Sequence, residues 1–430
     1  MKSCFIKIST VVCLLAPLAG FAQSFKLLTS FTNSRPGTVE YFGRGVAPLG
    51  SDRVLIGAPG DNSDEPIAGV AYLFSTNGIL LATFTNPTPQ TDDEFGRSIV
   101  ALGNDRVLIG APYDSIVAPN SGIVYLFNTN GTLLNTITNP TPAVDENFGL
   151  AIAALGSDRV VVGAPYDSLS AYLFDTNGTL LATFANSTSG YEDNYGFAVA
   201  AVGNDHVLIG ALSAGEGVGS AYLFNTNGAL VTTFINPISS QVWFGLAVAG
   251  MGSDRVLING HLFSTNGTLL TIFPTMNQSY FGVSVSALGS DRVLIGSVGA
   301  AFVFSTNGTL LSALNNPNGA GAGWFGNYLA AVGSDRVLIG AYREQNVGAA
   351  YLFSVEIPRL SVMHSGGGVI VSWPKTANDF VLDETQAFVP PPATTSWSQV
   401  SVVTYQTNAT SIFISVPGPS DSRFYRLRKL

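Results

Sequence analysis

The sequence has 430 residues, of which 46% are hydrophobic and only 11% are charged, and it contains 47 glycines. This composition excludes a disordered chain, because disorder requires low hydrophobicity and high net charge, and it favours short buried strands joined by tight turns. Between residues 24 and 357 there are 11 basic and 24 acidic residues. We therefore expect no nucleic-acid partner, because phosphate binding needs a basic surface.

Residues 1–22 have the pattern of a secretory signal peptide. Lys2 and Lys7 flank the start of a short apolar stretch at residues 8–19, and small residues precede a cleavage position after Ala22. The apolar stretch is too short for a stable membrane span, and no later segment is suited to one. Both cysteines of the sequence fall within the signal, so we expect neither disulfides nor thiolate metal sites in the mature chain. We expect a protein that is secreted or held at the cell surface.

One sequence unit recurs from residue 24 to residue 357. Each copy opens with an aromatic residue followed by glycine, and the spacings between openings range from 37 to 53 residues. The opening residues are Phe42, Phe95, Phe148, Tyr195, Phe244, Phe281 and Phe325. These starts predict seven units of supersecondary structure.

Each unit is predicted to contain four strands. In the first unit, the second to fourth strands are expected at residues 54–56, 71–74 and 80–84, and in the third unit the first strand is expected at residues 151–154. The second and third strands are continuously apolar, which predicts burial on both faces, as in sheets stacked around a ring. A Gly-Ser-Asp or Gly-Asn-Asp turn joins the first two strands, and an Asn-Gly turn joins the last two.

The seventh unit lacks the Asn-Gly turn and the fourth strand. Residues 27–33 resemble residues 80–86, which hold the fourth strand of the first unit. We therefore expect the N-terminal strand to complete the last sheet and to close a seven-bladed β-propeller, because closure removes free strand edges. The predicted fold class is all-β.

The segment Phe95-Gly96, followed by Gly110-Ala111-Pro112, resembles the FG-GAP repeat of integrin α-subunit propellers and of bacterial secreted proteins. The resemblance covers residues 24–357 and weakens toward the later units. It implies a β-propeller with a binding or adhesion function. Calcium-binding members of the family carry an Asp-rich loop between the first and second strands, where this chain has only Gly-Ser-Asp-Arg. The resemblance therefore does not imply calcium binding.

Residues 358–430 form a different module. Short apolar runs at residues 360–362, 369–373, 400–403 and 412–415 predict the strands of a small β-sandwich, similar to fibronectin-like modules. The basic segment 423–429 is expected to be a last strand with solvated charges. The predicted organisation is thus a signal peptide at 1–22, a propeller at 23–357 and a sandwich at 358–430.

Carboxylates concentrate in two kinds of loop that share one face of the predicted propeller, which we call the loop face. These loops join the second strand to the third, and the fourth strand to the next unit. The candidate metal ligands are Asp61, Asn62, Asp64 and Glu65, because Ca²⁺ takes six to eight oxygen ligands. The other candidate ligand contacts are Asp92, Asp93, Glu94, Tyr113, Asp114, Asp145, Glu146, Tyr166, Asp167, Glu192 and Asp193. All belong to the first four units, so the face should have an acidic half and a bare half.

The alternative interpretation is that these acids are solvated loop residues that keep a charge-poor protein soluble. The repeated Asp-Arg pair, as in Asp52-Arg53, is expected to serve the turn and the sheet edge. We assign no cofactor, and calcium at the first loop is the open alternative. His206, His261 and His364 have no partner at a recognisable spacing, so no catalytic triad is expected and no catalytic residue is assigned.

The leading hypothesis is a non-enzymatic extracellular binding or adhesion protein, expected to be a monomer, that presents its loop face to a protein or a polysaccharide. One alternative is a secreted carbohydrate-active hydrolase or lyase that uses loop carboxylates. Another alternative is a structural protein of a surface layer. Fold alone does not decide between them.

Overall fold

The computed structural model describes residues 24–33, 40–62, 65–166, 170–185, 193–214, 217–238, 243–276, 278, 280–319, 323–356, 360–365, 368–374, 380–386, 396–408, 411–417 and 423–429. Phe25–Ser354 forms one compact unit, and the strands from Val355 onward belong to a second. The described residues of both units form strands and two short 3₁₀ helices, with no α-helix. The expected signal peptide lies outside the described residues.

The strands described between Ser24 and Glu356 form seven four-stranded sheets, which resemble the blades of a propeller. The first sheet contains β2 (Gly45–Leu49), β3 (Arg53–Ala58), β4 (Val70–Ser75) and β5 (Leu80–Thr85). The second contains β6 (Ser98–Leu102), β7 (Arg106–Ala111), β8 (Ile123–Asn128) and β9 (Leu133–Thr138). The third contains β10 (Ala151–Leu155), β11 (Arg159–Ala164), β12 (Ser170–Asp175) and β13 (Leu180–Ala185). The fourth contains β14 (Tyr195–Val202), β15 (His206–Ala211), β16 (Ser220–Asn225) and β17 (Leu230–Ile235).

The remaining three sheets follow the same order. The fifth contains β18 (Val248–Met251), β19 (Arg255–Ile258), β20 (His261–Ser264) and β21 (Leu269–Ile272). The sixth contains β22 (Ser284–Leu288), β23 (Arg292–Ser297), β24 (Ala300–Ser305) and β25 (Leu310–Asn315). The seventh contains β26 (Tyr328–Val332), β27 (Arg336–Ala341), β28 (Ala349–Glu356) and β1 (Ser24–Phe31), with the short 3₁₀ helix η2 (Glu344–Asn346) between β27 and β28.

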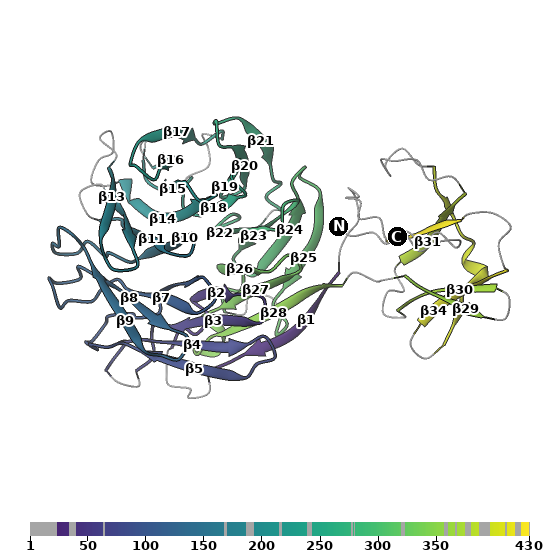
Figure 1. The fold of residues 1–430 in the computed structure, drawn as a ribbon, viewed down its shortest axis with the longest axis horizontal. Helices are drawn as coiled ribbons and strands as arrows, with labels where there is room; N and C mark the ends of the chain where they lie inside the picture. Colours follow the sequence, from purple (N-terminus) through teal and green to yellow (C-terminus); the bar gives the residue numbers. More distant parts are fainter. Residues whose placement is uncertain are drawn as a thin grey trace. The chain divides into compact units, whose positions relative to one another are not determined.

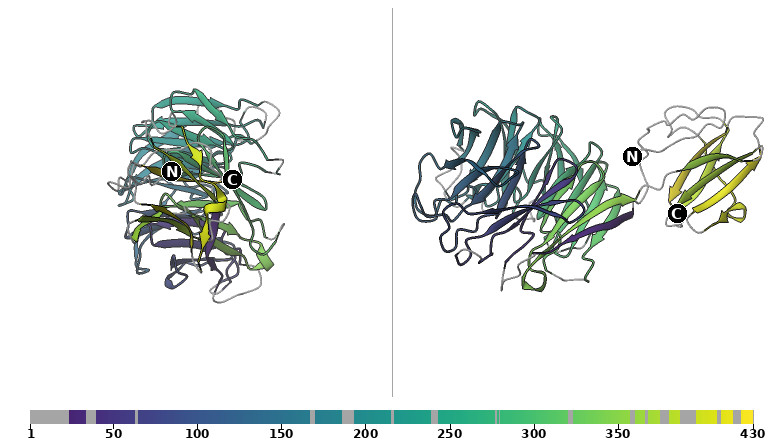
Figure 2. Two further views of the ribbon diagram at one scale, coloured as in Figure 1. Left: turned by 90° about the vertical axis from the view of Figure 1, so that its right-hand side faces the viewer. Right: turned by 60° about the horizontal axis from the view of Figure 1, so that its bottom comes forward.

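The first strands of these sheets lie toward the middle of the unit and the fourth strands at its periphery (Figure 1). Two further views show the same succession of sheets (Figure 2). First strands of consecutive sheets contact each other, and β2 of the first sheet also contacts β26 of the last. Strand β1 is hydrogen-bonded to β28, as the similarity between residues 27–33 and 80–86 predicted.

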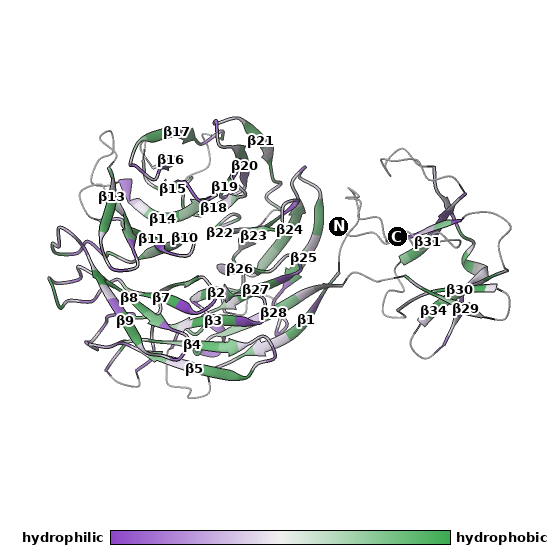
Figure 3. Ribbon diagram, in the orientation of Figure 1, coloured by the Kyte–Doolittle hydropathy of each residue, from purple (hydrophilic) through white to green (hydrophobic). Residues whose placement is uncertain are grey.

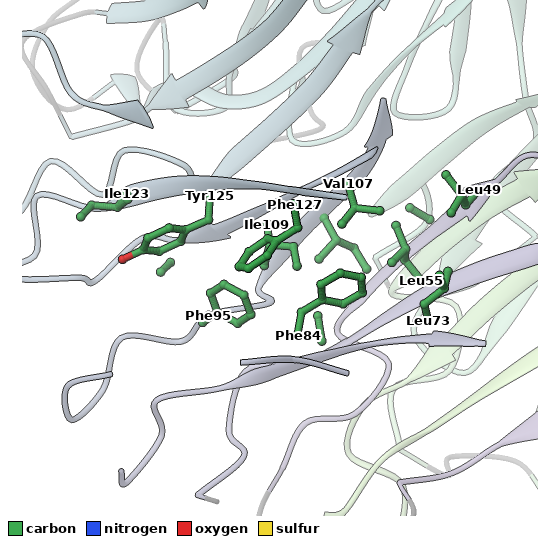
Figure 4. Packing of buried hydrophobic residues seen from close by; sticks show 14 residues of the cluster. Leu49, Leu55, Leu73, Phe84, Phe95, Val107, Ile109, Ile123, Tyr125 and Phe127 are labelled. Atoms are coloured by element: carbon green, nitrogen blue, oxygen red, sulfur yellow. The ribbon is translucent and has the colours of Figure 1, made fainter. Parts of the chain in front are cut away.

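Burial explains why the second and third strands are continuously apolar. In the first sheet, β3 and β4 are buried at all positions but one, whereas β5 buries only Phe84. Hydrophobic residues lie mainly on the strands, and the turns at their ends are largely hydrophilic (Figure 3). Side chains of the first and second sheets, among them Leu55, Phe84 and Phe127, pack into one shared core (Figure 4).

The two glycines of the repeat fit against each other between neighbouring sheets. A Cβ atom on Gly57 would lie 1.9 Å from the carbonyl oxygen of Gly96, which has φ +91° and belongs to the next unit. Only glycine lets the two backbones approach this closely. A Cβ atom on Gly340 would likewise lie 1.9 Å from the oxygen of Gly43, so the last and first sheets make the same contact.

The repeated Asp-Arg pair also joins neighbouring sheets. Arg53 donates from Nη2 to the carbonyl oxygen of Asn104 at 2.8 Å, one unit further along the chain. Arg336 of the seventh sheet bonds in the same way to the carbonyl of Ser51. The pair therefore has the sheet-edge role expected for it. His206 replaces the arginine of the fourth sheet, and its Nδ1 instead lies 2.8 Å from Oδ1 of Asp205.

The C-terminal unit consists of two small sheets around one core. One sheet contains β29 (Ser361–Ser365), β30 (Gly368–Pro374), β34 (Ser411–Pro417) and β33 (Gln406–Thr407), and the other contains β32 (Ser398–Gln399), β31 (Phe380–Thr385) and β35 (Phe424–Lys429). Trp373 and Ile414 of the first sheet share a cluster with Leu382 and Tyr425 of the second.

Two expectations for this unit are wrong. The strand expected at residues 400–403 is replaced by a 3₁₀ turn, η4 (Val402–Thr404). The chain turns there because Tyr405 packs edge-on against Trp373, with 5.0 Å between the ring centres. The last strand does not carry only solvated charges. Arg426 lies 3.0 Å from the buried carboxylate of Asp383, and a buried charge needs such a partner.

Candidate functional site

The two kinds of acidic loop meet on one face, as expected. The backbone N–H of Asp92, before the second sheet, donates to the carbonyl of Pro66 in the loop between β3 and β4 at 2.9 Å. Asp145 makes the equivalent bond to Pro119 one unit later, also at 2.9 Å. The two kinds of loop are therefore hydrogen-bonded to each other between the first and second sheets and between the second and third.

Several of the loop acids are buried between sheets rather than exposed. Most of them accept a hydrogen bond from an asparagine that follows the fourth strand of the preceding sheet. Asn86 donates from Nδ2 to Oδ2 of Asp93 at 2.7 Å, and Asn139 donates to Oε2 of Glu146 at 2.7 Å. Asn33 donates to Glu40 in the same way. We call these groups the junction clusters.

A tyrosine from the third strand completes several junction clusters. The hydroxyl of Tyr72 donates to Oδ2 of Asp61 at 3.1 Å, and that of Tyr125 donates to Oδ2 of Asp114 at 3.0 Å. In the seventh sheet, Tyr351 donates to Oε1 of Glu344 at 2.7 Å. Amide and phenol donors thus meet much of the hydrogen-bonding need of these buried carboxylates.

Burial shifts the ionisation of these acids. It raises the pKa of Asp93 to about 7, although hydrogen bonds from Gln90 and Asn86 oppose the shift, and the charge of Asp114 adds to it. Burial also raises the pKa values of Asp114 and Glu40. In Asp93, only Oδ2 is hydrogen-bonded, and Oδ1 has no partner among the described residues.

The predicted site residues therefore divide into groups. Four are buried in junction clusters, so the solvated-loop interpretation is wrong for Asp61, Asp93, Asp114 and Glu146. Five are exposed, namely Asn62, Glu65, Asp92, Asp145 and Tyr166. Glu94, Tyr113 and Asp193 are half-buried. Asp64, Asp167 and Glu192 lie outside the described residues.

The described members of the candidate calcium loop do not point to one centre. Asp61 faces Asn33 and Tyr72 inside a junction cluster, while Oδ1 of Asn62 accepts the backbone N–H of Ile67 at 2.7 Å. Glu65 is exposed. Across the described part of the chain, no three histidine, aspartate, glutamate or cysteine side chains are grouped to hold a metal ion.

A second set of residues on the loop face escaped the sequence analysis. The residue before each Phe-Gly or Tyr-Gly pair has a left-handed backbone, with φ between 50° and 65°. These residues are Tyr41, Glu94, Asn147, Asn194, Trp243, Tyr280 and Trp324. Such φ values are uncommon for bulky residues and are typical of functional or strained positions. The sequence feature that could have identified these residues is their fixed place in the repeat, directly before the opening aromatic residue.

The aromatic members of this set lie before four consecutive sheets. Trp243, Tyr280, Trp324 and Tyr41 precede the fifth, sixth, seventh and first sheets, and we call them the aromatic arc. Trp243 and Tyr280 stack with ring centres 5.9 Å apart and an interplanar angle of 7°, yet both side chains stay largely exposed. Tyr342 contacts both Trp324 and Tyr41, at 5.9 and 6.0 Å between ring centres.

A cavity of about 470 Å³ opens beside the first two members of the arc. Its described lining includes Trp243, Tyr280, Phe244, Phe281, Asn236 and His261, and no charged residue is among the described lining residues. The lining segments precede or belong to the fifth and sixth sheets. The cavity therefore lies on the half of the face where no ligand contact was expected.

His261 is the more deeply buried of two buried polar side chains that line this cavity, the other being Asn236. Its side chain is 3% exposed, and neither ring nitrogen makes a hydrogen bond of normal geometry to the described residues. Burial lowers the pKa of His261, opposed in part by the backbone of Ile258. His261 precedes Leu262-Phe263 as Tyr72 precedes Leu73-Phe74, so it takes the place of the junction tyrosine.

Comparison with known proteins gives one match. A sequence profile of the FG-GAP repeat matches residues 81–127, and no curated protein matches the chain. The matched segment runs from within β5 to within β8, so one sequence repeat covers the last strand of one sheet and three strands of the next. Within the described residues, no helix is long and apolar enough to cross a membrane. The chain therefore contains an FG-GAP repeat at residues 81–127.

Proposed function

We propose that this chain is a non-enzymatic extracellular binding protein. In this proposal the seven sheets form a closed seven-bladed propeller that presents its loop face to a glycan or protein ligand. The signal peptide directs export, and the C-terminal unit is a small fibronectin-like sandwich that acts as a spacer or attachment. The presence of FG-GAP repeats in adhesion and binding propellers supports this function.

The aromatic arc is the observation that carries the proposal. Trp243, Tyr280 and Trp324 are 41%, 54% and 38% exposed, although tryptophan and tyrosine gain most from burial. They occupy equivalent places on one face, at the left-handed position that precedes the opening aromatic residue of each unit. Exposed aromatic side chains gathered on one face are typical of an interaction surface.

Three contacts support closure of the ring. Strand β1 pairs with β28, Gly340 packs on Gly43, and Arg336 bonds to the carbonyl of Ser51. Each joins the last sheet to the start of the chain, and the last two repeat contacts made between earlier neighbours. A closed ring would hold the loop face rigid, which lowers the entropic cost of binding.

The junction clusters favour binding over hydrolysis. Asp114 lies close enough to Asp93 to raise the pKa of Asp93, as one carboxylate of a catalytic pair does to the other. Both side chains are 0% exposed, however, and Asn86 and Tyr125 occupy their inner oxygens. A substrate would therefore have no access to either carboxylate.

The test uses the mature chain, residues 23–430, in sedimentation assays with cellulose, chitin, starch and peptidoglycan, and in surface binding to extracellular-matrix proteins. We expect saturable binding to at least one of them and no release of reducing sugar. Trp243→Ala combined with Tyr280→Ala should weaken this binding, while Leu180→Ala on the exposed outer strand β13 should not. Reducing-sugar release that is lost in Asp93→Asn would instead establish a hydrolase.

Calcium at Asp61, Asn62, Asp64 and Glu65 is tested separately. Calcium at 100 times its dissociation constant would stabilise the chain by about 2.7 kcal/mol, which is visible as a rise of the melting midpoint over that in EDTA. Glu65→Gln is the suitable variant, because Glu65 is exposed and stands outside the junction clusters. A midpoint that is identical in calcium and EDTA would exclude this site.

A further inference from the structure

We propose that the cavity beside His261 binds a neutral sugar residue of an extracellular glycan. The inference rests on the proposed binding function and gives it a position and a ligand class. Three features carry it: the missing junction acid, the unsatisfied imidazole, and the uncharged aromatic wall.

The cavity exists because one junction cluster is incomplete. Between the seventh and first sheets, Asp61 accepts hydrogen bonds from both Asn33 and Tyr72. Between the fourth and fifth sheets, Asn236 and His261 take the corresponding places. The loop that would bring an acid between them is reduced to two residues, since β19 ends at Ile258 and β20 begins at His261. The resulting volume of about 470 Å³ lies within the range of small-molecule sites.

No described residue gives His261 a hydrogen bond of normal geometry. A buried polar side chain without hydrogen bonds lowers stability, so its retention here points to a ligand that satisfies it. Because burial lowers its pKa, the imidazole is neutral at pH 7, with one N–H donor and one nitrogen acceptor. A hydroxyl group both donates and accepts a hydrogen bond, and so it matches either nitrogen.

The walls select against other ligands. An ionised ligand would lose its hydration in a cavity without a charged residue, and a purely apolar ligand would leave His261 unpaired. A sugar ring has an apolar face of C–H groups and an edge of hydroxyls. The exposed rings of Trp243 and Tyr280 border the cavity and offer flat surfaces for the apolar face.

The experiment is saturation-transfer NMR on the mature chain with cellotriose, maltotriose, mannotriose and N,N′-diacetylchitobiose at millimolar concentration, and with p-cresol as an aromatic probe. We expect at least one of the saccharides to bind. Trp243→Ala and His261→Phe should each weaken that affinity by about tenfold or more, because they remove the stacking surface and the hydrogen bond. Phenylalanine suits this position structurally, since Phe302 occupies it in the sixth sheet, so His261→Phe should melt no lower than the wild type.

Trp324→Ala is the matched control. Trp324 also precedes a Phe-Gly pair, is 38% exposed and has φ 60°, yet it does not line the cavity. Its variant should bind the saccharide as the wild type does. Binding of p-cresol alone, binding of no saccharide, or equal affinity in His261→Phe would each overturn the sugar site. If His261→Phe still binds whole polysaccharide or matrix protein normally, the propeller is a binding protein that uses another part of its face.

Discussion

At the scale of single residues, Asp93 shows what burial of a loop acid costs. Its Oδ2 accepts bonds from Asn86 and from the backbone of Gln90, both at 2.7 Å, while Oδ1 has no partner within the described residues. Burial raises its pKa from the usual 3.8 to about 7. The folded state favours the protonated carboxyl group of Asp93. Its contribution to stability is therefore complete below pH 4 and is lost as the pH rises through 7.

Asp93→Asn should therefore stabilise the protein at high pH only. Asparagine keeps the acceptor that faces Asn86 and removes the buried negative charge. We expect a free energy of unfolding higher than that of the wild type by about 1–3 kcal/mol at pH 8, and a nearly equal value at pH 3.5. Urea unfolding at the two pH values measures this difference.

Asp92→Asn is the control for that measurement, since Asp92 is the exposed neighbour of Asp93. Removing a solvated charge should change the stability little at either pH. An Asp93→Asn variant that is less stable than the wild type at pH 8 would show that the ionised carboxylate contributes to the junction.

At the scale of the strand, β1 has the same structural role as β5, although β1 lies far in the sequence from the other strands of its sheet. Phe31 of β1 is 2% exposed and packs on Phe74 at 5.4 Å between ring centres. Phe84 of β5 is 1% exposed and packs on Phe127 at 5.5 Å. Phe31→Ala and Phe84→Ala should therefore each destabilise the chain by about 3–5 kcal/mol in urea unfolding. A Phe31→Ala variant as stable as the wild type would mean that β1 does not stabilise the last sheet.

Local chemistry explains which elements the sequence could predict. Strands such as β3 and β4 are predictable because an unbroken apolar run must be buried on both faces, and turns such as Asn77-Gly78 because glycine accepts the φ of +87° found there. The 3₁₀ turn at Val402–Thr404 was not predictable, because its cause is the contact of Tyr405 with Trp373, which lies 32 positions earlier. The same holds for the candidate site. The short loop before His261 was visible in the sequence, whereas the cavity depends on how Trp243 and Tyr280 stack across two sheets.

At the scale of the whole molecule, the open question is the seam between the last and first sheets. Gly340 and Gly43 meet there as Gly57 and Gly96 meet between the first two sheets, with 1.9 Å from an added Cβ atom to the opposing carbonyl oxygen in both cases. An alanine in place of Gly340 or Gly57 would force two backbones apart. If the ring is closed, both substitutions disturb equivalent contacts. If the ring is open, only the alanine in place of Gly57 disturbs such a contact.

Gly340→Ala and Gly57→Ala should therefore lower the free energy of unfolding by similar amounts, about 3 kcal/mol each, in urea unfolding of the mature chain. Gly299→Ala separates this clash from backbone strain, because Gly299 has φ +97° but no heavy atom within 4 Å of an added Cβ. That variant should lose only about 1–2 kcal/mol, the cost of a left-handed alanine. A Gly340→Ala variant as stable as the wild type, beside a destabilised Gly57→Ala, would mean that the seam is open in solution. The loop face would then flex at the side where Tyr41 meets Tyr342, and a rigid aromatic arc would no longer explain binding.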